Sequence, residues 1–94
     1  MDYRDKTLRN MQEIIHFVGR YRREHLVSPT LAEIAVGIGM TEKDFGNVQP
    51  MVKKLVEEGF LFYAAKGGAR TIVVSDPQPR PYYYRREIKE VTES

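Results

Sequence analysis

The spacing of apolar residues between Thr7 and Glu24 predicts a long amphipathic helix. Six apolar or aromatic positions recur there every three or four residues, which is the period of one helix face. They are Leu8, Met11, Ile14, Ile15, Val18 and Tyr21. The charged residues of this segment fall mostly between them. We therefore expect a helix over residues 7–24 with one buried side and one solvated side.

The segment 28–35 is typical of a helix start. The hydroxyl of Thr30 can accept the amide of Glu33, and the carboxylate of Glu33 can accept the amide of Thr30 in return, which makes a capping box. The apolar residues that follow share one helix face. We expect a short helix over residues 31–38 that ends at Gly39 in a left-handed turn.

A third helix is predicted between Thr41 and Gly59, but Pro50 leaves two possible starts for it. If the helix began at Glu42, Pro50 would lie deep inside it, at a cost of about 3 kcal/mol. If Asn47 caps the helix, Pro50 falls in the first turn, where its missing amide has no helical partner in any case. We predict the second arrangement.

In this arrangement residues 41–45 form a short helical turn or a loop, in which Thr41 and Asp44 can make a second capping sequence. Gly46 is predicted to separate this segment from the main helix. The main helix runs over residues 48–58, and Gly59 ends it. The helix buries an apolar stripe at helical spacing. That stripe is Val48, Val52, Leu55 and Val56.

The period changes after Gly59, where aromatic and β-branched residues dominate two short runs, 60–65 and 70–74. Such residues suit strands. Residues 66–69 contain two glycines, which permit the positive φ values of a tight turn. We expect a two-stranded hairpin here.

Residues 76–81 cannot continue the sheet, because three prolines lack the donors of a strand ladder. We expect an extended spacer. The segment 82–91, rich in tyrosine and arginine, is either a short helix that packs its tyrosines on the body or a mobile tail. Its tyrosines could instead stack on bases, but packing on the domain or across a dimer is favoured.

Three helices followed by a hairpin describe a mainly α fold with a small β-hairpin, the winged helix-turn-helix. The domain is predicted to cover residues 1–75, a three-helix bundle with a two-stranded wing. Residues 76–94 form a Pro-rich spacer and a Tyr/Arg-rich C-terminal extension.

Three stretches carry a family resemblance: PTLAEIA at 29–35, Ile38-Gly39, and VKKLVEEGF at 52–60. Over roughly residues 7–75 the chain resembles the DNA-binding domain of LexA-type repressors. The resemblance implies that the helix ending at Gly59 lies in the major groove and that the hairpin tip touches the DNA backbone. The segment between Gly39 and Leu55 is slightly longer here than in that family. The protease domain of that family has no counterpart in the chain, so self-cleavage is not implied.

The composition narrows the classes of site that are possible. The chain of 94 residues has no cysteine, which excludes disulfides and thiolate metal sites and fits a reducing cytosol. Its start does not resemble a signal peptide, and no apolar run approaches the roughly 20 residues that span a bilayer. We expect a cytoplasmic protein that does not engage a membrane.

The net charge of +2 is spread unevenly along the chain. Residues 1–25 carry six basic and four acidic side chains, residues 26–75 carry five of each, and residues 76–94 carry four of each. Any face that binds DNA must therefore arise from local clustering of charge. This balance argues against strong non-specific binding.

The early, outward positions of the third helix are the main candidates for contact with DNA. Their amides can pair with an adenine edge in the major groove, and their lysines can meet phosphates. A proline there offers apolar contact, for example to a thymine methyl group. The alternative is that these residues are only the solvated face of an amphipathic helix. The set is Asn47, Gln49, Pro50, Lys53 and Lys54.

Further candidates flank this helix. In a wing, residues at the hairpin turn would track phosphate, although charged residues there also keep a sheet edge from pairing. Amides at a helix start favour an anion, but Thr30 is expected foremost as a cap. The additional DNA-binding candidates are Ser28, Thr30, Thr41, Lys43, Lys66, Gly67 and Arg70.

Enzyme chemistry has little support in the sequence. Glu13 and His16 have a spacing that some helical metal sites use, but no second carboxylate–histidine pair accompanies them. The glycines at 37 and 39 lie inside the predicted helix-turn-helix and do not suit a nucleotide phosphate. We expect no catalysis, no metal, no cofactor and no small-molecule ligand.

These observations predict a transcriptional regulator that binds double-stranded DNA sequence-specifically as a homodimer, with repression favoured over activation. The rival hypothesis is a winged-helix adaptor that binds other proteins and little or no DNA. The neutral core, Pro50 on the presumed DNA-binding face and the aromatic tail favour that rival. An accessory subunit of an enzyme or of the replication machinery is a third possibility.

Overall fold

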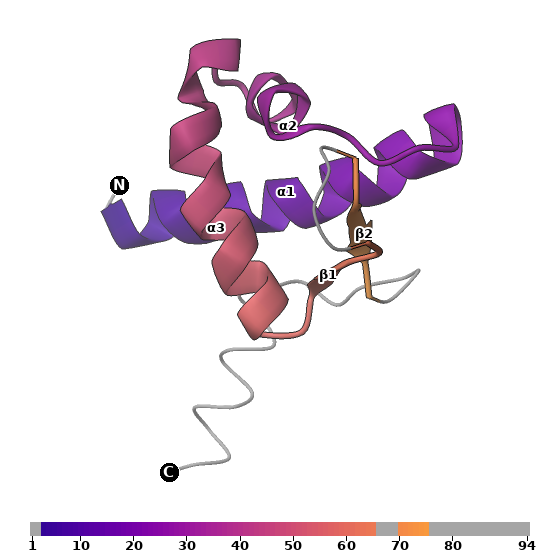
Figure 1. Ribbon diagram of the computed structural model, residues 1–94. Coiled ribbons are helices and arrows are strands. Elements are labelled where there is room, and N and C mark those ends of the chain that lie inside the picture. The colour runs from indigo at the N-terminus through magenta and orange to yellow at the C-terminus, as the bar shows by residue number, and fades with distance from the viewer. Residues whose placement is uncertain (1–2, 66–69, 76–94) are drawn as a thin grey trace, which may run out of the picture.

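The computed structural model of the chain describes residues 3–65 and 70–75. Over these residues, three α-helices and one short 3-10 helix are followed by two strands that pair antiparallel (Figure 1). The elements in order are α1 (Tyr3–His25), α2 (Leu31–Gly37), the 3-10 helix η1 (Glu42–Asp44), α3 (Phe45–Glu57), β1 (Leu61–Tyr63) and β2 (Ile72–Val74).

The longest helix, α1, supports the other elements. In Figure 1 α3 crosses it steeply, and α2 and the sheet also pack against it. The predicted apolar stripe is confirmed for four of its six members, because Met11, Ile14, Ile15 and Val18 are buried. The other two, Leu8 and Tyr21, are partly buried. The helix begins four residues before the predicted start at Thr7. The extra residues are Tyr3 and three charged residues, so they do not extend the repeat of apolar positions by which a sequence could place the start.

The capped start of α2 is confirmed in detail. The Glu33 amide donates to the Thr30 hydroxyl at 3.1 Å, and the Thr30 amide donates to a Glu33 carboxylate oxygen at 2.8 Å. The helix ends at Gly37, one residue before the predicted end, and Gly39 takes the left-handed φ of +93°. The turn between α2 and the next element is therefore the one that the sequence predicts.

The predicted start of α3 is wrong. Residues 41–45 do hold a helical turn, η1, in which the Thr41 amide donates to the Asp44 carboxylate at 2.9 Å. However, α3 follows η1 directly from Phe45, so Gly46 is no break and Asn47 is no cap. The helix continues because η1 already supplies a wound turn from which it can propagate.

Pro50 consequently lies inside α3, the arrangement that the cost of an interior proline argued against. Its ring nitrogen cannot donate to the carbonyl of Gly46, which is the acceptor four residues earlier. Gly46 is exposed, so water can reach that carbonyl. At its other end α3 stops at Glu57, one residue before the predicted end, and Gly59 takes a left-handed φ of +85° as the predicted terminating glycine.

The two strands form the predicted hairpin, although each is shorter than its apolar run. Leu61 pairs with Val74 and Tyr63 with Ile72. Beyond the strand ends, the Ala64 amide donates to the Thr71 carbonyl at 2.7 Å. The predicted turn at 66–69, the spacer and the C-terminal extension lie outside the described residues.

The core lies where the three helices and the sheet meet. Its members come from every α-helix and both strands, so each of these elements buries its apolar face by packing against the others. They are Met11, Ile14, Ile15, Val18, Ile34, Ala35, Val48, Val52, Leu55, Phe60, Leu61 and Ile72. The described part of the chain is thus a mainly helical fold with a small antiparallel hairpin.

Two glycines in helices have opposite surroundings, which yields a matched prediction. A Cβ at Gly37 would lie 2.3 Å from the Phe17 ring, whereas a Cβ at Gly46 would meet nothing within 4 Å. We expect Gly37→Ala to lower the free energy of unfolding by about 1–3 kcal/mol, because the ring must move. We expect Gly46→Ala to raise it by about 0.5–1 kcal/mol through helix propensity. Urea unfolding of both variants measures the two signs, and equal effects would contradict this packing.

Candidate nucleic-acid interface

The outward face of α3 presents the side chains that the sequence analysis singled out. Three apolar residues, Val48, Val52 and Leu55, hold the helix to the body and are at most 1% exposed. The five candidates on the helix are all exposed to solvent. These are Asn47, Gln49, Pro50, Lys53 and Lys54. The displaced start of α3 did not affect this result, because the helical phase is set by the buried stripe.

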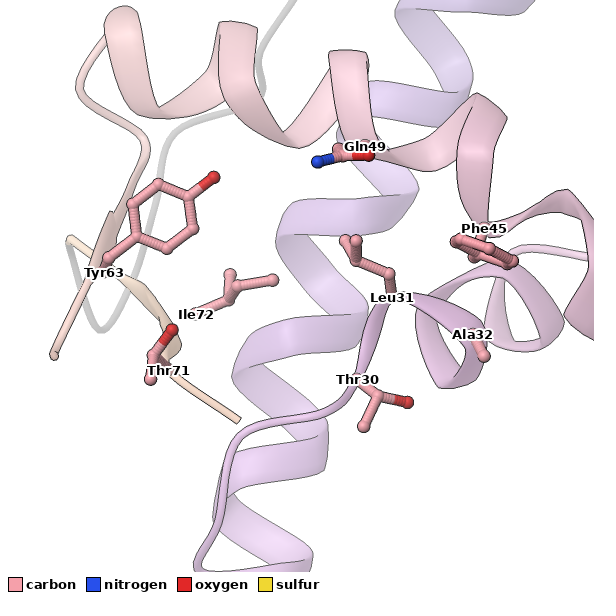
Figure 2. A pocket seen from close by; sticks show the side chains of 8 residues that line it. All are labelled: Thr30, Leu31, Ala32, Phe45, Gln49, Tyr63, Thr71 and Ile72. Carbon is pink, nitrogen blue, oxygen red and sulfur yellow. The ribbon is translucent and has the colours of Figure 1, made fainter. Parts of the chain in front are cut away.

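The candidates do not form one cluster, because α3 has a groove on each flank. The first, the hairpin-side groove, lies between α3, the start of α2 and the sheet, and has a volume of about 380 Å³. Figure 2 shows Gln49 reaching over it from α3, with Leu31 and Ile72 below. Its lining is Thr30, Leu31, Ala32, Phe45, Gln49, Tyr63, Thr71 and Ile72.

The second groove, the α1-side groove, lies between α3 and the N-terminal half of α1, with a volume of about 560 Å³. It holds Asn47, Pro50 and Lys54, while Gln49 belongs to the other flank. Its remaining lining comes from α1, the turn before η1 and α3. Those residues are Lys6, Thr7, Asn10, Met11, Met40 and Met51. Asn47 and Gln49 therefore face different sides of the helix.

Gln49 is the amide that is better placed to meet a ligand. The side-chain amide nitrogen of Asn47 (Nδ2) lies 3.5 Å from the Asp44 carboxylate, toward which it can donate. Gln49 lies instead among hydroxyls and two half-exposed aromatic rings, Phe45 and Tyr63, which are 52% and 50% exposed. The rings stand at opposite ends of the groove in Figure 2. The groove thus combines a hydrogen-bonding side chain with apolar contact area.

The candidates at the start of α2 are occupied by contacts within the protein. Ser28 is 1% exposed, and its hydroxyl accepts a hydrogen bond from Arg22 at 2.7 Å. A direct phosphate contact by this hydroxyl would require that bond to break and the segment to move. The hydroxyl and the amide of Thr30 both bond to Glu33, which confirms its role as a cap.

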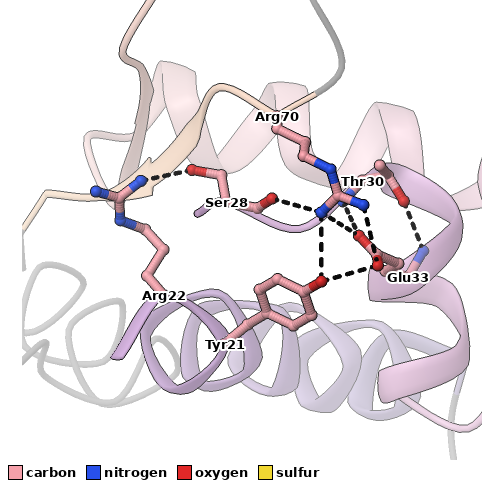
Figure 3. A network of polar contacts seen from close by, with 6 residues as sticks. All are labelled: Tyr21, Arg22, Ser28, Thr30, Glu33 and Arg70. Atoms are coloured by element: carbon pink, nitrogen blue, oxygen red, sulfur yellow. Dashed lines mark hydrogen bonds and ion pairs between the residues drawn. The ribbon is translucent and has the colours of Figure 1, made fainter. Parts of the chain in front are cut away.

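Arg70 lies at the centre of a polar network that sequence reasoning did not foresee (Figure 3). Its guanidinium donates to both Glu33 carboxylate oxygens, at 2.8 and 3.3 Å, and also to the carbonyl of Ser28 at 3.1 Å. The Tyr21 hydroxyl lies 3.3 Å from the same guanidinium and donates to Glu33 at 2.8 Å. The predicted phosphate ligand is therefore paired with a carboxylate.

This network stabilises the charged forms of its members. The pKa of the Glu33 carboxyl is lowered from 4.5 to about 2, mainly because the Thr30 amide donates to it, with further hydrogen bonds from Tyr21 and Arg70. The pKa of Arg70 is raised by its hydrogen bonds with Tyr21 and Glu33. Glu33 is thus a fixed anion beside the hairpin.

The remaining candidates fall at the edges of this region. Thr41 donates through its amide and its hydroxyl to Asp44, which lowers the pKa of that carboxyl. Lys43, in η1, is exposed. Lys66 and Gly67 lie outside the described residues.

The residues considered for a metal do not converge. His16 is exposed and contacts the amide of Gln12 at 2.9 Å. Across residues 3–65 and 70–75, no group of three or more histidine or acidic side chains could hold a metal ion. In the same part of the chain, none of the helices has the length and apolar character needed to cross a bilayer.

Sequence reasoning missed Tyr21, Phe45 and Tyr63. The sequence pattern places Tyr21 in the apolar stripe of α1, yet its hydroxyl joins the polar network. The signal available was that a tyrosine at the edge of a stripe keeps a polar end that needs a partner. Phe45 precedes the predicted helix, so no helical period placed it at the edge of the hairpin-side groove.

Comparison with protein-family models, with curated proteins and with solved structures finds no match to this chain. The geometry above is therefore the basis on which a function can be proposed.

The lowered pKa of Glu33 predicts an acid-dependent loss of stability. Because the folded pKa of about 2 is below the ordinary 4.5, ionised Glu33 stabilises the fold above about pH 4.5, and this is lost as the pH falls toward 2. We expect Glu33→Gln, which can keep the capping box, to be less stable than wild type at neutral pH. The difference between the two should shrink over that interval in urea unfolding. Asp44 titrates in both the wild type and the variant, so its contribution cancels from the difference between their free energies of unfolding. A difference independent of pH would contradict the assignment.

Proposed function

We propose that this protein is a winged-helix DNA-binding protein, which reads double-stranded DNA through α3 and acts as a transcriptional regulator. The observation that carries the proposal is the exposure of all five candidate side chains on α3 while its opposite stripe is buried. Three helices followed by an antiparallel hairpin are compatible with this fold. The resemblance of residues 7–75 to LexA-type DNA-binding domains supports the same function.

The dimensions of α3 suit a major groove. Its 13 residues span about 20 Å, and a major groove about 12 Å wide admits a helix. Gln49 lies on the flank nearest the hairpin and can pair with the edge of an adenine. Lys53, one turn farther along, is exposed and can contact phosphate. Gln49 is therefore the proposed reader of sequence, and Lys53 fixes position.

A single domain of this kind makes few phosphate contacts. Linking two such domains raises the effective affinity without any new contact, and operators commonly repeat their half-sites with the symmetry of a dimer. We therefore propose that the protein acts as a homodimer, with repression favoured over activation. The mass of the protein in solution, measured with and without a duplex of two half-sites, tests this assembly.

The second candidate function is that of a protein-binding adaptor. Phe45 and Tyr63, each about half exposed, border a largely apolar groove of about 380 Å³. Exposed aromatic residues are enriched at protein interfaces. The charge balance of residues 26–75 also favours this rival, which predicts no measurable association with random duplex DNA even at low ionic strength.

The two roles on α3 can be separated by substitution. We expect Lys53→Ala to weaken binding to all sequences alike. For each domain bound, it should reduce the slope of log affinity against log salt by about 0.9, the value for one phosphate contact. We expect Gln49→Ala to change the preferred sequence, with about 1–3 kcal/mol of discrimination lost at one base pair. Selection of duplexes from a random pool, followed by binding titrations at several salt concentrations, measures both effects.

Arg9→Ala removes the same charge as Lys53→Ala from an exposed position of α1 and serves as the control. It should leave the salt slope unchanged. Retention of wild-type affinity and sequence preference in both α3 variants would exclude the insertion of this helix into the groove. Absence of binding by the wild type at low salt would favour the adaptor.

A further inference from the structure

We propose that Arg70 is a positioning residue, which fixes the hairpin against α1 and α2 through Glu33, and that it is not a phosphate ligand. The contacts involved form the Glu33 cluster, whose members come from four separate parts of the chain. They are Tyr21, Ser28, Thr30, Glu33 and Arg70 (Figure 3).

The cluster occupies the edge of the guanidinium that is formed by Nη1 and Nη2. Arg70 Nη1 lies 2.8 Å from Glu33 Oε1, 3.1 Å from the Ser28 carbonyl and 3.3 Å from the Tyr21 hydroxyl. Nη2 lies 3.3 Å from Glu33 Oε2, so the pair is bidentate. A fork of this kind gives geometric specificity as well as energy. Arg70 therefore has one well-defined position relative to both helices.

The acceptor is fixed just as firmly as the donor. Glu33 Oε1 also accepts the Thr30 amide at 2.8 Å, and Oε2 accepts the Tyr21 hydroxyl at 2.8 Å. The cap of α2 and the anchor of the hairpin are thus the same carboxylate. A phosphate that approached the Nη1–Nη2 edge of Arg70 would have to displace this bidentate carboxylate. At the other edge, formed by Nε and Nη2, it would still meet the nearby negative charge of Glu33.

Arg70 lies close to the paired strands, so its contacts with α1 and α2 act on the hairpin. It stands directly before Thr71, whose carbonyl accepts the Ala64 amide at 2.7 Å, and two residues before β2. Thr71 and Ile72 also line the hairpin-side groove opposite Gln49. Holding Arg70 therefore sets the distance between the hairpin and α3, which a duplex must span. Only this last consequence rests on the proposed function.

The structural part of the inference is tested without DNA. We expect Arg70→Gln, Glu33→Gln and Tyr21→Phe each to speed amide hydrogen exchange at Ala64 by about two- to fivefold, the size expected for a partly exposed ion pair. The Ser75 amide, which bonds to the Phe60 carbonyl at the other end of the sheet, should change less. The Arg70→Gln, Glu33→Gln double variant should exceed neither single variant by much, because both remove the same bond.

The control is Arg9→Gln, which removes an exposed arginine of α1. Tyr21→Phe removes a single hydroxyl, so it keeps the test available if a charge variant fails to fold. Unchanged exchange at Ala64 in all three variants, or additive effects in the double variant, would overturn the positioning role whether or not the protein binds DNA.

The direction of the change in duplex affinity separates a positioning role from direct contact with phosphate. Loss of the Glu33 charge would tighten DNA binding if electrostatics alone mattered, whereas the positioning role predicts about two- to fivefold weaker binding for Glu33→Gln, as for Arg70→Gln. The salt slope of Arg70→Gln should equal that of wild type. Arg70→Lys should not restore affinity, since an ammonium cannot reproduce the fork.

Tighter binding by Glu33→Gln, a slope reduced by about 0.9, or rescue by lysine would each overturn the proposal. If the wild type binds no duplex, the proposed function fails while the exchange experiment still decides the positioning role.

Discussion

The carboxylate of Glu33 joins parts of the molecule that are distant in sequence. It receives the amide that caps α2, the hydroxyl of a tyrosine on α1 and the guanidinium before β2. The side chains of Arg70 and Glu33 are 44% and 34% exposed, so the ion pair alone contributes little, as surface pairs generally do. Its importance is geometric. The apolar core fixes which faces meet, and in the proposed positioning role this carboxylate fixes how the hairpin is oriented on the helices.

The same division of roles holds for α3. Val48, Val52 and Leu55 determine which way the helix is turned, and this outcome is insensitive to where the helix begins. Pro50 shows how large an unfavourable local free energy α3 tolerates. A proline in the interior of an isolated helix costs about 3 kcal/mol, yet α3 continues through Pro50. Three buried residues, each contributing about 1.5–3 kcal/mol, are enough to hold the segment helical despite that cost. Tertiary packing therefore overrides the local preference that led the sequence analysis to place the start at Asn47.

Features that depend on local order along the chain could be predicted from the sequence, whereas those that depend on distant partners could not. The capping box of Thr30 and Glu33 spans three residues, and the stripes of α1 and α3 repeat within each helix, so all were correctly anticipated. The exposed set on α3 followed from the same periodicity. The partners of Arg70 are 37 to 49 residues away in sequence, and no local pattern links them. The division of Asn47 and Gln49 between two grooves likewise depends on which elements flank α3.

The way the chain uses its cations bears on how such a face could recognise a duplex. Among the described residues α3 carries two exposed lysines, Lys53 and Lys54, and the nearby Arg70 is held by Glu33. Two or three phosphate contacts per domain imply that the affinity of one domain falls only about 10- to 40-fold between 50 and 200 mM salt, whereas proteins with 6–10 contacts lose about 10³–10⁵. In the proposed complex the non-specific part of binding would be correspondingly small, and affinity would come mainly from the fit of α3 and the hairpin to the groove. An arginine that holds the hairpin in place would then contribute to recognition without contacting a phosphate itself, because a fit of this kind is lost when either element moves.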